Sequence, residues 1–283
     1  MHQKNFSVRT MTRQELTLAR QWAITEGWNP GIHEANCFYA TDPNGFLIGM
    51  LDDEPIASLS VVKYGESFGF LGFYIVKPEH RGKGYGMQIW NAGMIYLEGR
   101  TIGLDGVIDQ QSNYQKSGFE LAYRNLRFQG LGGGVVSKDP AILDLSHIPL
   151  EQLFAYDRAF YLQNRSIFLK CWIQQAESAA IGIMHQQQLV GYGAIRRCHN
   201  GYKIGPLFAD NVDFAERLFN DLKARVPSDT TIFMDIPELN TQALDLASRH
   251  AMVVSFETAR MYKGIRPELP MEKIFGVTSL ELG

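Results

Sequence analysis

Apolar and polar residues alternate at two different periods along the first half of the chain, which predicts a mixture of strands and helices. Alternation from Phe6 to Arg9 is typical of a half-buried strand, whereas Leu16, Ala19 and Ala23 recur at helical spacing. Two short apolar runs, 46–51 and 56–62, flank a turn sequence rich in acidic residues and proline. Such a pair predicts a β-hairpin.

The next segments predict the centre of a sheet. Phe68 to Val76 is apolar at nearly every position, as expected of a strand that is buried on both faces. Further along, helical and strand patterns follow in turn: a helix over Met87–Leu97, a strand over Thr101–Ile108, a short helix over Ser112–Ser117 and a strand over Leu121–Gln129.

The second half repeats this order in a less regular form, after the glycine-rich stretch 130–134. A hairpin, a strand, a helix, a strand, a helix and a final strand are predicted over 180–196, 202–207, 214–223, 231–236, 241–249 and 251–262. The fold class is therefore α/β (α+β), with a mixed, mostly antiparallel sheet in each of two domains and helices on both faces. The predicted bounds are 1–130 and 141–266, with a linker at 131–140 and a tail at 267–283.

Composition and charge narrow the functional class. The chain has 283 residues, of which 45% are hydrophobic and 20% charged, as in a globular protein. No apolar run reaches the ~18 residues of a membrane span, and the first residues do not read as a signal peptide. The net charge of −3 shows no basic excess. We therefore expect a cytoplasmic protein with neither a membrane nor a nucleic-acid partner.

The cysteines predict neither a disulfide framework nor a metal site. Cys37, Cys171 and Cys198 are far apart and odd in number, so reduced thiols are expected. The stretch His33-Glu34-Ala35-Asn36-Cys37 lacks the second histidine of a metalloprotease helix. No metal is therefore predicted.

A glycine-rich turn carries the clearest chemical signal. Between the strand that ends at Val76 and the helix that begins near Tyr85, glycines occupy positions 82, 84 and 86. Glycines let the backbone approach a ligand, and the amides and dipole of a helix N-terminus favour a pyrophosphate. Charge for the same ligand comes from Lys77, Arg81 and Lys83.

Two other phosphate motifs fit this turn less well. A Walker loop requires Gly-Lys-Ser/Thr, but Gly84 follows Gly82-Lys83. A dinucleotide fingerprint requires a third glycine where Ile89 stands, although Asp105 does lie about twenty residues further on. A dinucleotide-binding oxidoreductase therefore stays as an alternative hypothesis.

The residues around this turn resemble a known family. Arg81-x-x-Gly84-x-Gly86, after Phe73-Tyr74-Ile75-Val76-x-Pro78, is similar to the acyl-CoA signature of GNAT N-acetyltransferases. The later run Asn113-Tyr114-Gln115-Lys116-Ser117-Gly118-Phe119 resembles their second signature. The resemblance covers Phe6 to Gly130, and the whole chain is similar to bacterial tandem-GNAT proteins with a divergent C-terminal domain.

This resemblance implies a fold and a set of roles. In such enzymes two central strands splay apart and hold the pantetheine of acetyl-CoA, here Phe68–Val76 and Thr101–Ile108. Tyr114 would protonate the departing thiolate, which a phenol with a pKa of ~10 can do. The implied cofactor-binding residues are Tyr74, Ile75, Val76, Arg81, Gly82, Lys83, Gly84, Tyr85, Gly86, Asn113 and Lys116. For Asn113 a helix-capping role is equally open.

The general base is less defined. The strand Phe68–Val76 has no Asp, Glu or His, so we take Glu34 as the candidate, with His33, Asp105 and Asp109 also open. The stretch 21–62 has acidic residues but no Lys or Arg, which favours a cationic amine as acceptor. Candidate acceptor-binding residues in this stretch are Glu26, Trp28, Asn29 and His33.

The predicted function is an N-acyltransferase. It would transfer an acetyl group from acetyl-CoA to a primary amine of a small molecule or peptide, by direct attack in a ternary complex. A non-catalytic acyl-CoA sensor with the same fold is the alternative. The second half lacks the glycine turn and reads Phe208-Ala209-Asp210-Asn211-Val212-Asp213 in its place, so it should bind no CoA. The expected oligomeric state is a monomer or homodimer.

Overall fold

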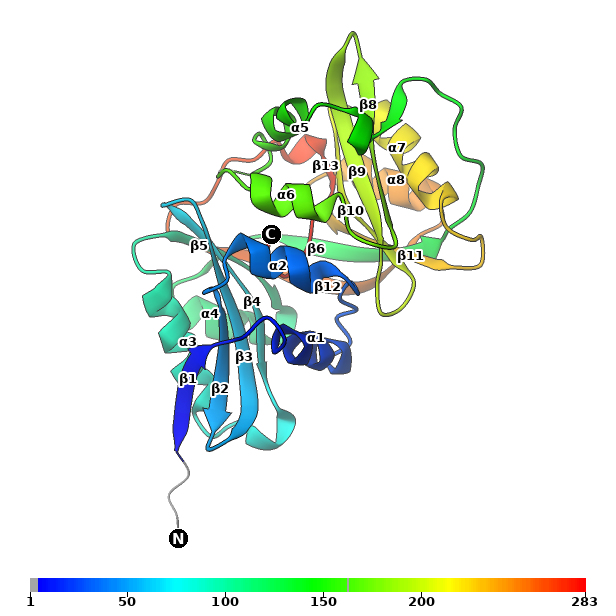
Figure 1. Cartoon of the computed structure of the whole chain (residues 1–283). Helices are drawn as coiled ribbons and strands as arrows, with labels where there is room; N and C mark the ends of the chain where they lie inside the picture. Colours follow the sequence, from blue (N-terminus) through cyan, green and yellow to red (C-terminus); the bar gives the residue numbers. More distant parts are fainter. Residues whose placement is uncertain (1–4, 162) are drawn as a thin grey trace.

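The computed structural model describes residues 5–161 and 163–283, and its two halves contain the same series of elements (Figure 1). The first half comprises β1 (Phe6–Thr10), α1 (Leu16–Thr25), α2 (Glu34–Thr41), β2 (Phe46–Leu51), β3 (Glu54–Tyr64), β4 (Phe68–Val76), α3 (Tyr85–Tyr96), β5 (Thr101–Val107), α4 (Gln111–Lys116) and β6 (Glu120–Leu131). The second comprises β7 (Ile142–Asp144), α5 (Leu150–Asp157), α6 (Ser166–Trp172), β8 (Ser178–His185), β9 (Gln188–Arg197), β10 (Tyr202–Ala209), α7 (Val212–Ala224), β11 (Thr231–Pro237), α8 (Thr241–Arg249), β12 (Val253–Lys263) and β13 (Ile274–Gly276). The predicted internal repeat is thus present in the fold.

The two halves share one sheet because they exchange their last strands. Within the described residues, the strands follow the order β1-β2-β3-β4-β5-β12-β6-β11-β10-β9-β8-β7, and β13 pairs with β10. Strand β12 of the second half therefore lies between β5 and β6 of the first, and β6 pairs with β11. In Figure 1 these long strands run between the two halves. The halves are consequently not separable at residue 131.

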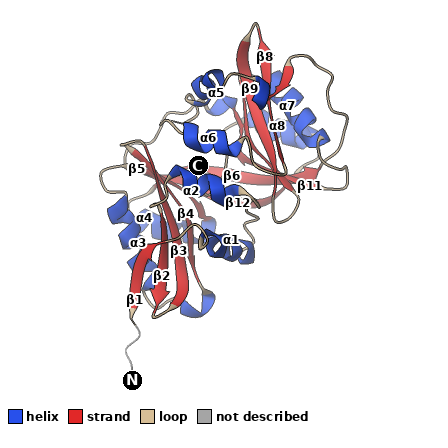
Figure 2. Ribbon diagram, viewed as in Figure 1, coloured by secondary structure: helices blue, strands red, loops and turns tan. Residues whose placement is uncertain are grey.

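The fold class agrees with the prediction. Helices lie on both sides of the sheet (Figure 2). The strand pairs are antiparallel except for β4–β5 and β10–β11, among the pairs formed by described residues. Helix α3 packs closely on β3 because Gly93 faces that strand, where a Cβ atom would lie 2.5 Å from Leu59 Cδ2. This contact fixes the glycine-rich turn ahead of α3 against the sheet.

Strands β4 and β5 separate partway along their length, as the resemblance implied. They pair only from Phe68–Leu71 to Thr101–Leu104. Directly afterwards Phe73 has a φ of 45°, which is an unusual conformation for a bulky residue and turns β4 away from β5. The result is a V-shaped gap whose apex lies at Gly72 and Asp105.

The corresponding gap in the second half is filled by the chain itself. Strands β10 and β11 pair in parallel only from Tyr202 to Ile204. Beyond that point β13 pairs with β10, and the Val277 amide donates to the Asp235 carbonyl of β11 at 2.9 Å. Residues 274–283, which belong to the tail predicted at 267–283, are buried. They run from this second gap toward the first one.

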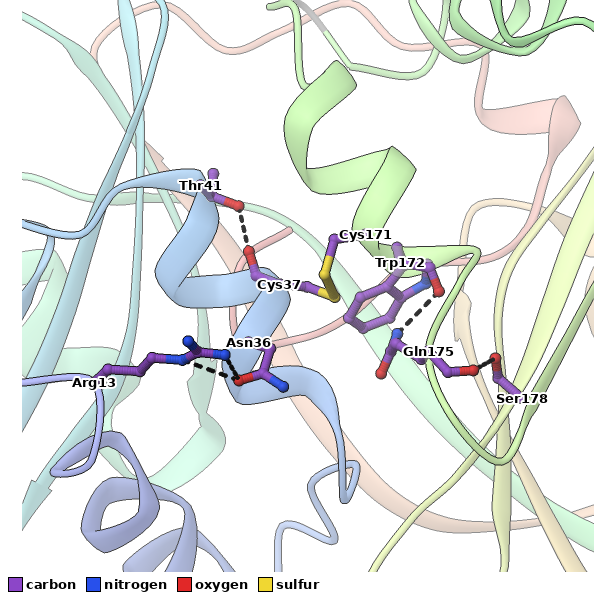
Figure 3. The surroundings of a disulfide bond; sticks show 8 residues. All are labelled: Arg13, Asn36, Cys37, Thr41, Cys171, Trp172, Gln175 and Ser178. Carbon is purple, nitrogen blue, oxygen red and sulfur yellow. Dashed lines mark hydrogen bonds between the residues drawn. A yellow bond between two sulfur atoms is a disulfide. The ribbon is translucent and has the colours of Figure 1, made fainter.

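The expectation of reduced thiols is wrong for two of the three cysteines. Cys37 of α2 and Cys171 of α6 form a disulfide, as Figure 3 shows. Their Cα atoms lie 5.2 Å apart, and their sequence separation is 134. Cys198 is a free, buried thiol. The two helices occupy equivalent places in the two halves and meet between them. Because only the three-dimensional arrangement of the repeat joins them, sequence spacing gave no sign of the pair.

The helices of the described residues include none that is long and apolar enough to cross a membrane.

Aromatic rings add to the contact between α2 and α6. Phe38 of α2 packs on Phe168 and Trp172 of α6, at centroid distances of 6.5 and 6.0 Å. The disulfide and this aromatic cluster together fasten the first half to the second.

Candidate active site

The main cavity lies in the V-shaped gap between β4 and β5 and has a volume of about 520 Å³. Its residues come from several parts of the chain: the loop after α1, the glycine-rich turn, the splayed parts of β4 and β5, the stretch from the end of β5 to α4, the exchanged strands β6 and β12, and the C-terminal segment 274–283. The side chains and backbone that matter below are Glu26, Trp28, Tyr74, Ile75, Val76, His80, Arg81, Gly82, Gly86, Asp105, Gly106, Asp109, Tyr114, Arg127, Phe256, Thr258 and Glu281.

One end of the cavity is formed by the glycine-rich turn. Gly82 and Gly84 have φ of 73° and 84°, and a Cβ atom on either would meet nothing within 4 Å. Within the described part of the chain, the amides from Gly82 to Gly86 donate no hydrogen bond to another backbone carbonyl. Free amides at the start of a twelve-residue helix form a site for an anion.

The cationic side chains of the turn are held by neighbouring groups. Arg81 Nε donates to the Val76 carbonyl oxygen at 2.8 Å, and its guanidinium is ion-paired with Glu26. Lys83 Nζ donates to the Glu79 carbonyl oxygen at 2.8 Å. Lys77 pairs with Glu54 on β3. Arg81 thus lines the cavity, whereas Lys83 and Lys77 are engaged outside it.

The splayed part of β4 supplies the wall next to this turn. Tyr74, Ile75 and Val76 all line the cavity. Gly86 allows the Tyr74 ring to lie against α3, because a Cβ atom there would come 2.8 Å from the Tyr74 hydroxyl. Burial raises the pKa of Tyr74 above its usual value.

Tyr114 of α4 faces the cavity from the other side. The Cδ2–Cε2 edge of its ring lies against β5 because Gly106 has no side chain, and a Cβ atom there would be 2.3 Å from Tyr114 Cε2. The ring stacks on Trp90 at a centroid distance of 5.6 Å. Burial, reinforced by Tyr74, raises the pKa of Tyr114 well above its usual value. The phenol is therefore held in the protonated form, which can donate a proton.

Besides Lys83, three further predicted cofactor-binding side chains lie outside the lining. Asn113 donates to Gln110 Oε1 at 2.8 Å, and Lys116 is exposed at the end of α4. Tyr85 packs on Phe6 with ring centroids 4.9 Å apart. The structure brings the two signature motifs to one cavity but does not aim these three side chains into it. Their roles stay predictions.

The predicted acceptor-binding residues divide into two pairs. Glu26 and Trp28 line the cavity. Asn29 instead exchanges hydrogen bonds of 2.9 and 2.8 Å with Asn200, and His33 Nε2 lies 3.0 Å from Glu177 Oε2. Both partners belong to the second half, so Asn29 and His33 fasten the loop before α2 to that half.

Glu34 is placed away from the cavity. It is buried, and it accepts hydrogen bonds from Arg196 Nε at 2.5 Å and from the Gly31 amide at 2.7 Å. Burial alone would raise its pKa, but the Arg196 and Lys203 charges hold the pKa of Glu34 below its usual value. This saturated carboxylate is an interdomain ion pair, and its position does not support the predicted role as general base.

The other carboxylates considered from the sequence differ in availability. Asp105 is buried at the apex of the V, where Arg260 Nη2 and Asn125 Nδ2 donate to it at 2.6 and 2.8 Å. Burial raises the pKa of Asp105 above its usual value, against the Arg260 charge. Because Arg260 lies on β12, these contacts of Asp105 hold β12 against β5. Asp109, by contrast, lines the cavity and is exposed.

The end of the cavity away from the glycine-rich turn is formed by residues that the sequence did not indicate. Arg127 of β6 is paired with Asp235 at 2.7 and 2.9 Å, and Phe256 and Thr258 come from β12. Glu281, in the C-terminal segment, is only 4% exposed. Among described residues, Glu281 Oε2 and Thr258 Oγ1 are buried without a hydrogen-bond partner. No local motif marks these positions, because strand exchange and the path of the C-terminus bring them here.

Comparisons with known proteins identify the two halves separately. Residues 11–119 match the model of the acetyltransferase (GNAT) family, and residues 153–276 match that of an acetyltransferase (GNAT) domain. The chain is 32% identical to holothin acyltransferase of Pseudoalteromonas sp. (strain SANK 73390) over 270 residues, which cover 95% of this chain and 92% of the relative.

Solved structures share the fold. A proposed acetyltransferase from Pyrococcus horikoshii has a TM-score of 0.80 at 20% identity, and the match covers 100% of this chain and 98% of that one. A tandem GNAT protein from the clavulanic acid biosynthesis pathway has a TM-score of 0.64 at 11% identity, with 93% and 100% covered.

Proposed function

Since the chain belongs to the GNAT acyltransferase family, we propose that it transfers an acetyl group from acetyl-CoA to a primary amine of a small molecule or peptide. The amine would attack the thioester directly while both substrates are bound. The observation that carries this proposal is the single cavity that joins the glycine-rich turn, the splayed strands and Tyr114.

The cavity suits the three parts of acetyl-CoA in order. The free amides from Gly82 to Gly86 would hold the diphosphate, since they combine with the dipole of α3 to favour an anion. The backbone of Tyr74 to Val76 would bind the pantetheine, because splaying leaves this part of β4 without a partner on the β5 side. These contacts direct the thioester toward Phe73 and Tyr114.

At that point the chemistry is a proton-coupled substitution. The amine nitrogen forms a bond to the carbonyl carbon and loses one N–H proton to solvent, the carbon–sulfur bond breaks, and the Tyr114 hydroxyl donates its proton to the departing sulfur. The phenolate then recovers a proton from solvent. A phenol is protonated at neutral pH, and burial, which raises the pKa of Tyr114, keeps it in that form.

The acceptor would enter at the opposite end, between Trp28 and Phe256. Glu26 also lines the cavity, where it is ion-paired with Arg81 beside the glycine-rich turn. Holothin is the first acceptor to test, because a relative that is 32% identical over 95% of the chain is named for acyl transfer to it. Amino acids, polyamines and peptides complete the panel.

A pair of substitutions at one position tests the cofactor site. Gly84 has a φ of 84°, which Asp and Asn adopt more readily than other residues, and its Cβ direction is open. Gly84→Asp places a carboxylate beside the expected diphosphate, and Gly84→Asn has the same size without the charge. Repulsion between unit charges ~4 Å apart is about 1–4 kcal/mol, depending on solvent screening. We expect Gly84→Asp to bind acetyl-CoA about 10- to 100-fold more weakly than Gly84→Asn.

Assays of acetyl-CoA binding and of CoA release distinguish an enzyme from a non-catalytic sensor. Release of free CoA with an amine, and its loss in Tyr114→Phe, would support the enzyme. Binding of acetyl-CoA without CoA release for any acceptor or acyl chain would favour the sensor. Equal affinity in the Asp and Asn variants would remove the proposed diphosphate site.

A further inference from the structure

The C-terminal segment brings a carboxylate to the apex of the splayed strands. The backbone carbonyl oxygen of Glu281 lies against Gly72, so closely that a Cβ atom on Gly72 would be 2.2 Å from it. Gly72 directly follows the last β4 residue paired with β5, Leu71. Glu281 is thus fixed where the two strands part, and its side chain lines the cavity.

This carboxylate lacks the partners that a buried charge normally has. Glu281 is 4% exposed, and Oε2 is buried without a hydrogen-bond partner within residues 5–161 and 163–283. Thr258, which lines the same cavity, has an Oγ1 atom that is equally unsatisfied. Unpaired buried polar atoms are costly, so their occurrence together at the end of a cavity indicates a ligand that carries a hydrogen-bond donor.

We propose that Glu281 is the general base that takes the proton from the acceptor amine. This inference rests on the proposed acyl transfer and assigns the one role which that reaction leaves open. As the amine nitrogen bonds to the thioester carbon, one N–H proton passes to the Glu281 carboxylate, directly or through one water. The carbon–sulfur bond breaks, Tyr114 protonates the sulfur, and solvent exchange returns the proton from Glu281 to the Tyr114 phenolate. The net products are an amide and CoA.

The surrounding charges keep this carboxylate usable as a base. Apart from Glu281, the neighbouring buried cluster contains two carboxylates and three cations: Glu34 of α2, Asp235 of β11, Arg127 of β6, Arg196 of β9 and Lys203 of β10. An ionised Glu281 makes the cluster neutral, so the carboxylate can exist in the resting protein. Burial, opposed by Lys203, raises the pKa of Glu281 above the usual value for glutamate. A base whose pKa lies closer to the working pH transfers protons more effectively.

Other groups in the cavity are less suited. Asp105 is occupied by Arg260 and Asn125. His80 also lines the cavity and has an unpartnered Nδ1, but it precedes Arg81 at the glycine-rich end, where the diphosphate is expected. Its loss should change acetyl-CoA affinity rather than proton transfer. Asp109 also lines the cavity, but it is exposed, so its carboxylate is solvated. Glu281 is the buried carboxylate at the opposite, acceptor-side end.

The test compares Glu281→Gln with Glu272→Gln, which changes an exposed glutamate just before β13. Acetyl-CoA affinity is measured by calorimetry, and kcat/KM for the amine is measured from pH 5 to 9. For Glu281→Gln we expect acetyl-CoA affinity within threefold of wild type and kcat/KM lower by about 10²- to 10⁴-fold. Glu272→Gln should match the wild type in both.

The pH profile distinguishes a base from a residue that only supports the structure. Activity should be complete above the raised pKa of Glu281 and should fall as pH drops through it. With two acceptors of different amine pKa, this limb should stay at one pH, and Glu281→Gln should lack it. Should Glu281→Gln fail to fold, the position of the acidic limb is measured in the wild type and in Glu281→Asp. That variant keeps the carboxylate but shortens its reach by one methylene group.

The outcomes separate this inference from the proposed function. Normal acetyl-CoA binding with turnover within tenfold of wild type in Glu281→Gln would overturn the role of Glu281 alone. A wild-type acidic limb that moves with the amine pKa would do so as well. A wild-type protein that does not bind acetyl-CoA would overturn the proposed function, and the base assignment with it.

Discussion

Gly106→Ala should disable Tyr114 without touching its hydroxyl. The added methyl group would lie 2.3 Å from Tyr114 Cε2 and 2.7 Å from Cδ2. Ordinary contacts between carbon atoms are ~3.5–4.0 Å, so the ring must move by about 1 Å or more. Trp90 stacks on the ring at a centroid distance of 5.6 Å, so a shift of the ring would also disturb this contact.

Two magnitudes follow from this geometry. Overpacking of this kind costs about 1–3 kcal/mol in the free energy of unfolding. A displacement of ~1 Å in a reacting group reduces the rate about 10²-fold. We therefore expect kcat to fall about 100-fold, and the apparent affinity for acetyl-CoA to change much less.

The assay is a double-mutant cycle with Tyr114→Phe, in which kcat is measured by CoA release and stability by thermal or chemical unfolding. Phenylalanine keeps the ring but removes the proton donor. Gly106→Ala should therefore reduce kcat in the wild-type background but hardly further in Tyr114→Phe, while it destabilises both. Gly103→Ala is the matched control, because that glycine lies on the same strand and would crowd Phe70 Cδ2 at 3.0 Å instead. Additive losses of kcat in the double mutant would refute the reasoning.

Two further predictions concern the contacts between the halves. Cys37→Ser should lower the free energy of unfolding by about 2–5 kcal/mol, because the disulfide closes a loop of 134 residues. Dithiothreitol should lower the melting temperature of the wild type similarly and leave that of the variant unchanged. Equal melting temperatures for the wild type and the variant would contradict the disulfide. Glu34→Gln should cost about 3–5 kcal/mol of stability, since it leaves Arg196 buried without its carboxylate. The kcat of the folded Glu34→Gln protein should stay within tenfold of wild type, and a selective loss of kcat at unchanged stability would instead restore Glu34 as a candidate base.

The parts of the site that could be predicted are those encoded locally. Glycines 82, 84 and 86 stand between a strand and a helix in the sequence, and their backbone role does not depend on distant residues. Tyr114 is likewise recognisable from nearby residues, because it lies in a short predicted helix that is followed by Gly118-Phe119. The order of elements was also readable, because period and turn residues are properties of short segments.

Contacts between distant segments account for what the sequence did not reveal. The alternation of apolar and polar residues in β6 and β12 would be the same whether each strand paired within its own half or with the other half. The pattern therefore does not indicate which strands they pair with. Asn29 and His33 look like pocket residues until Asn200 and Glu177, 171 and 144 residues away, are found to hold them. The segment 274–283 has no motif that indicates its return to the first half.

In the second half, groups of the chain itself occupy the positions that correspond to the glycine-rich turn and the V-shaped gap of the first half. The helix α7 that corresponds to α3 begins at an Asn211 cap, whose Oδ1 accepts the Phe214 amide at 2.9 Å. That side chain takes the place of an anion at the helix N-terminus. With β13 between β10 and β11, neither the diphosphate site nor the pantetheine gap is free, so we expect one acetyl-CoA per chain.

A crystal structure of the full chain with a non-reactive thioether analogue of acetyl-CoA tests the central claim most directly. We expect one analogue per chain, with its diphosphate on the amides from Gly82 to Gly86 and its pantetheine between β4 and β5. The acyl end should lie between Tyr114 and Glu281. An analogue bound between β10 and β11, or anywhere other than the gap between β4 and β5, would contradict the account.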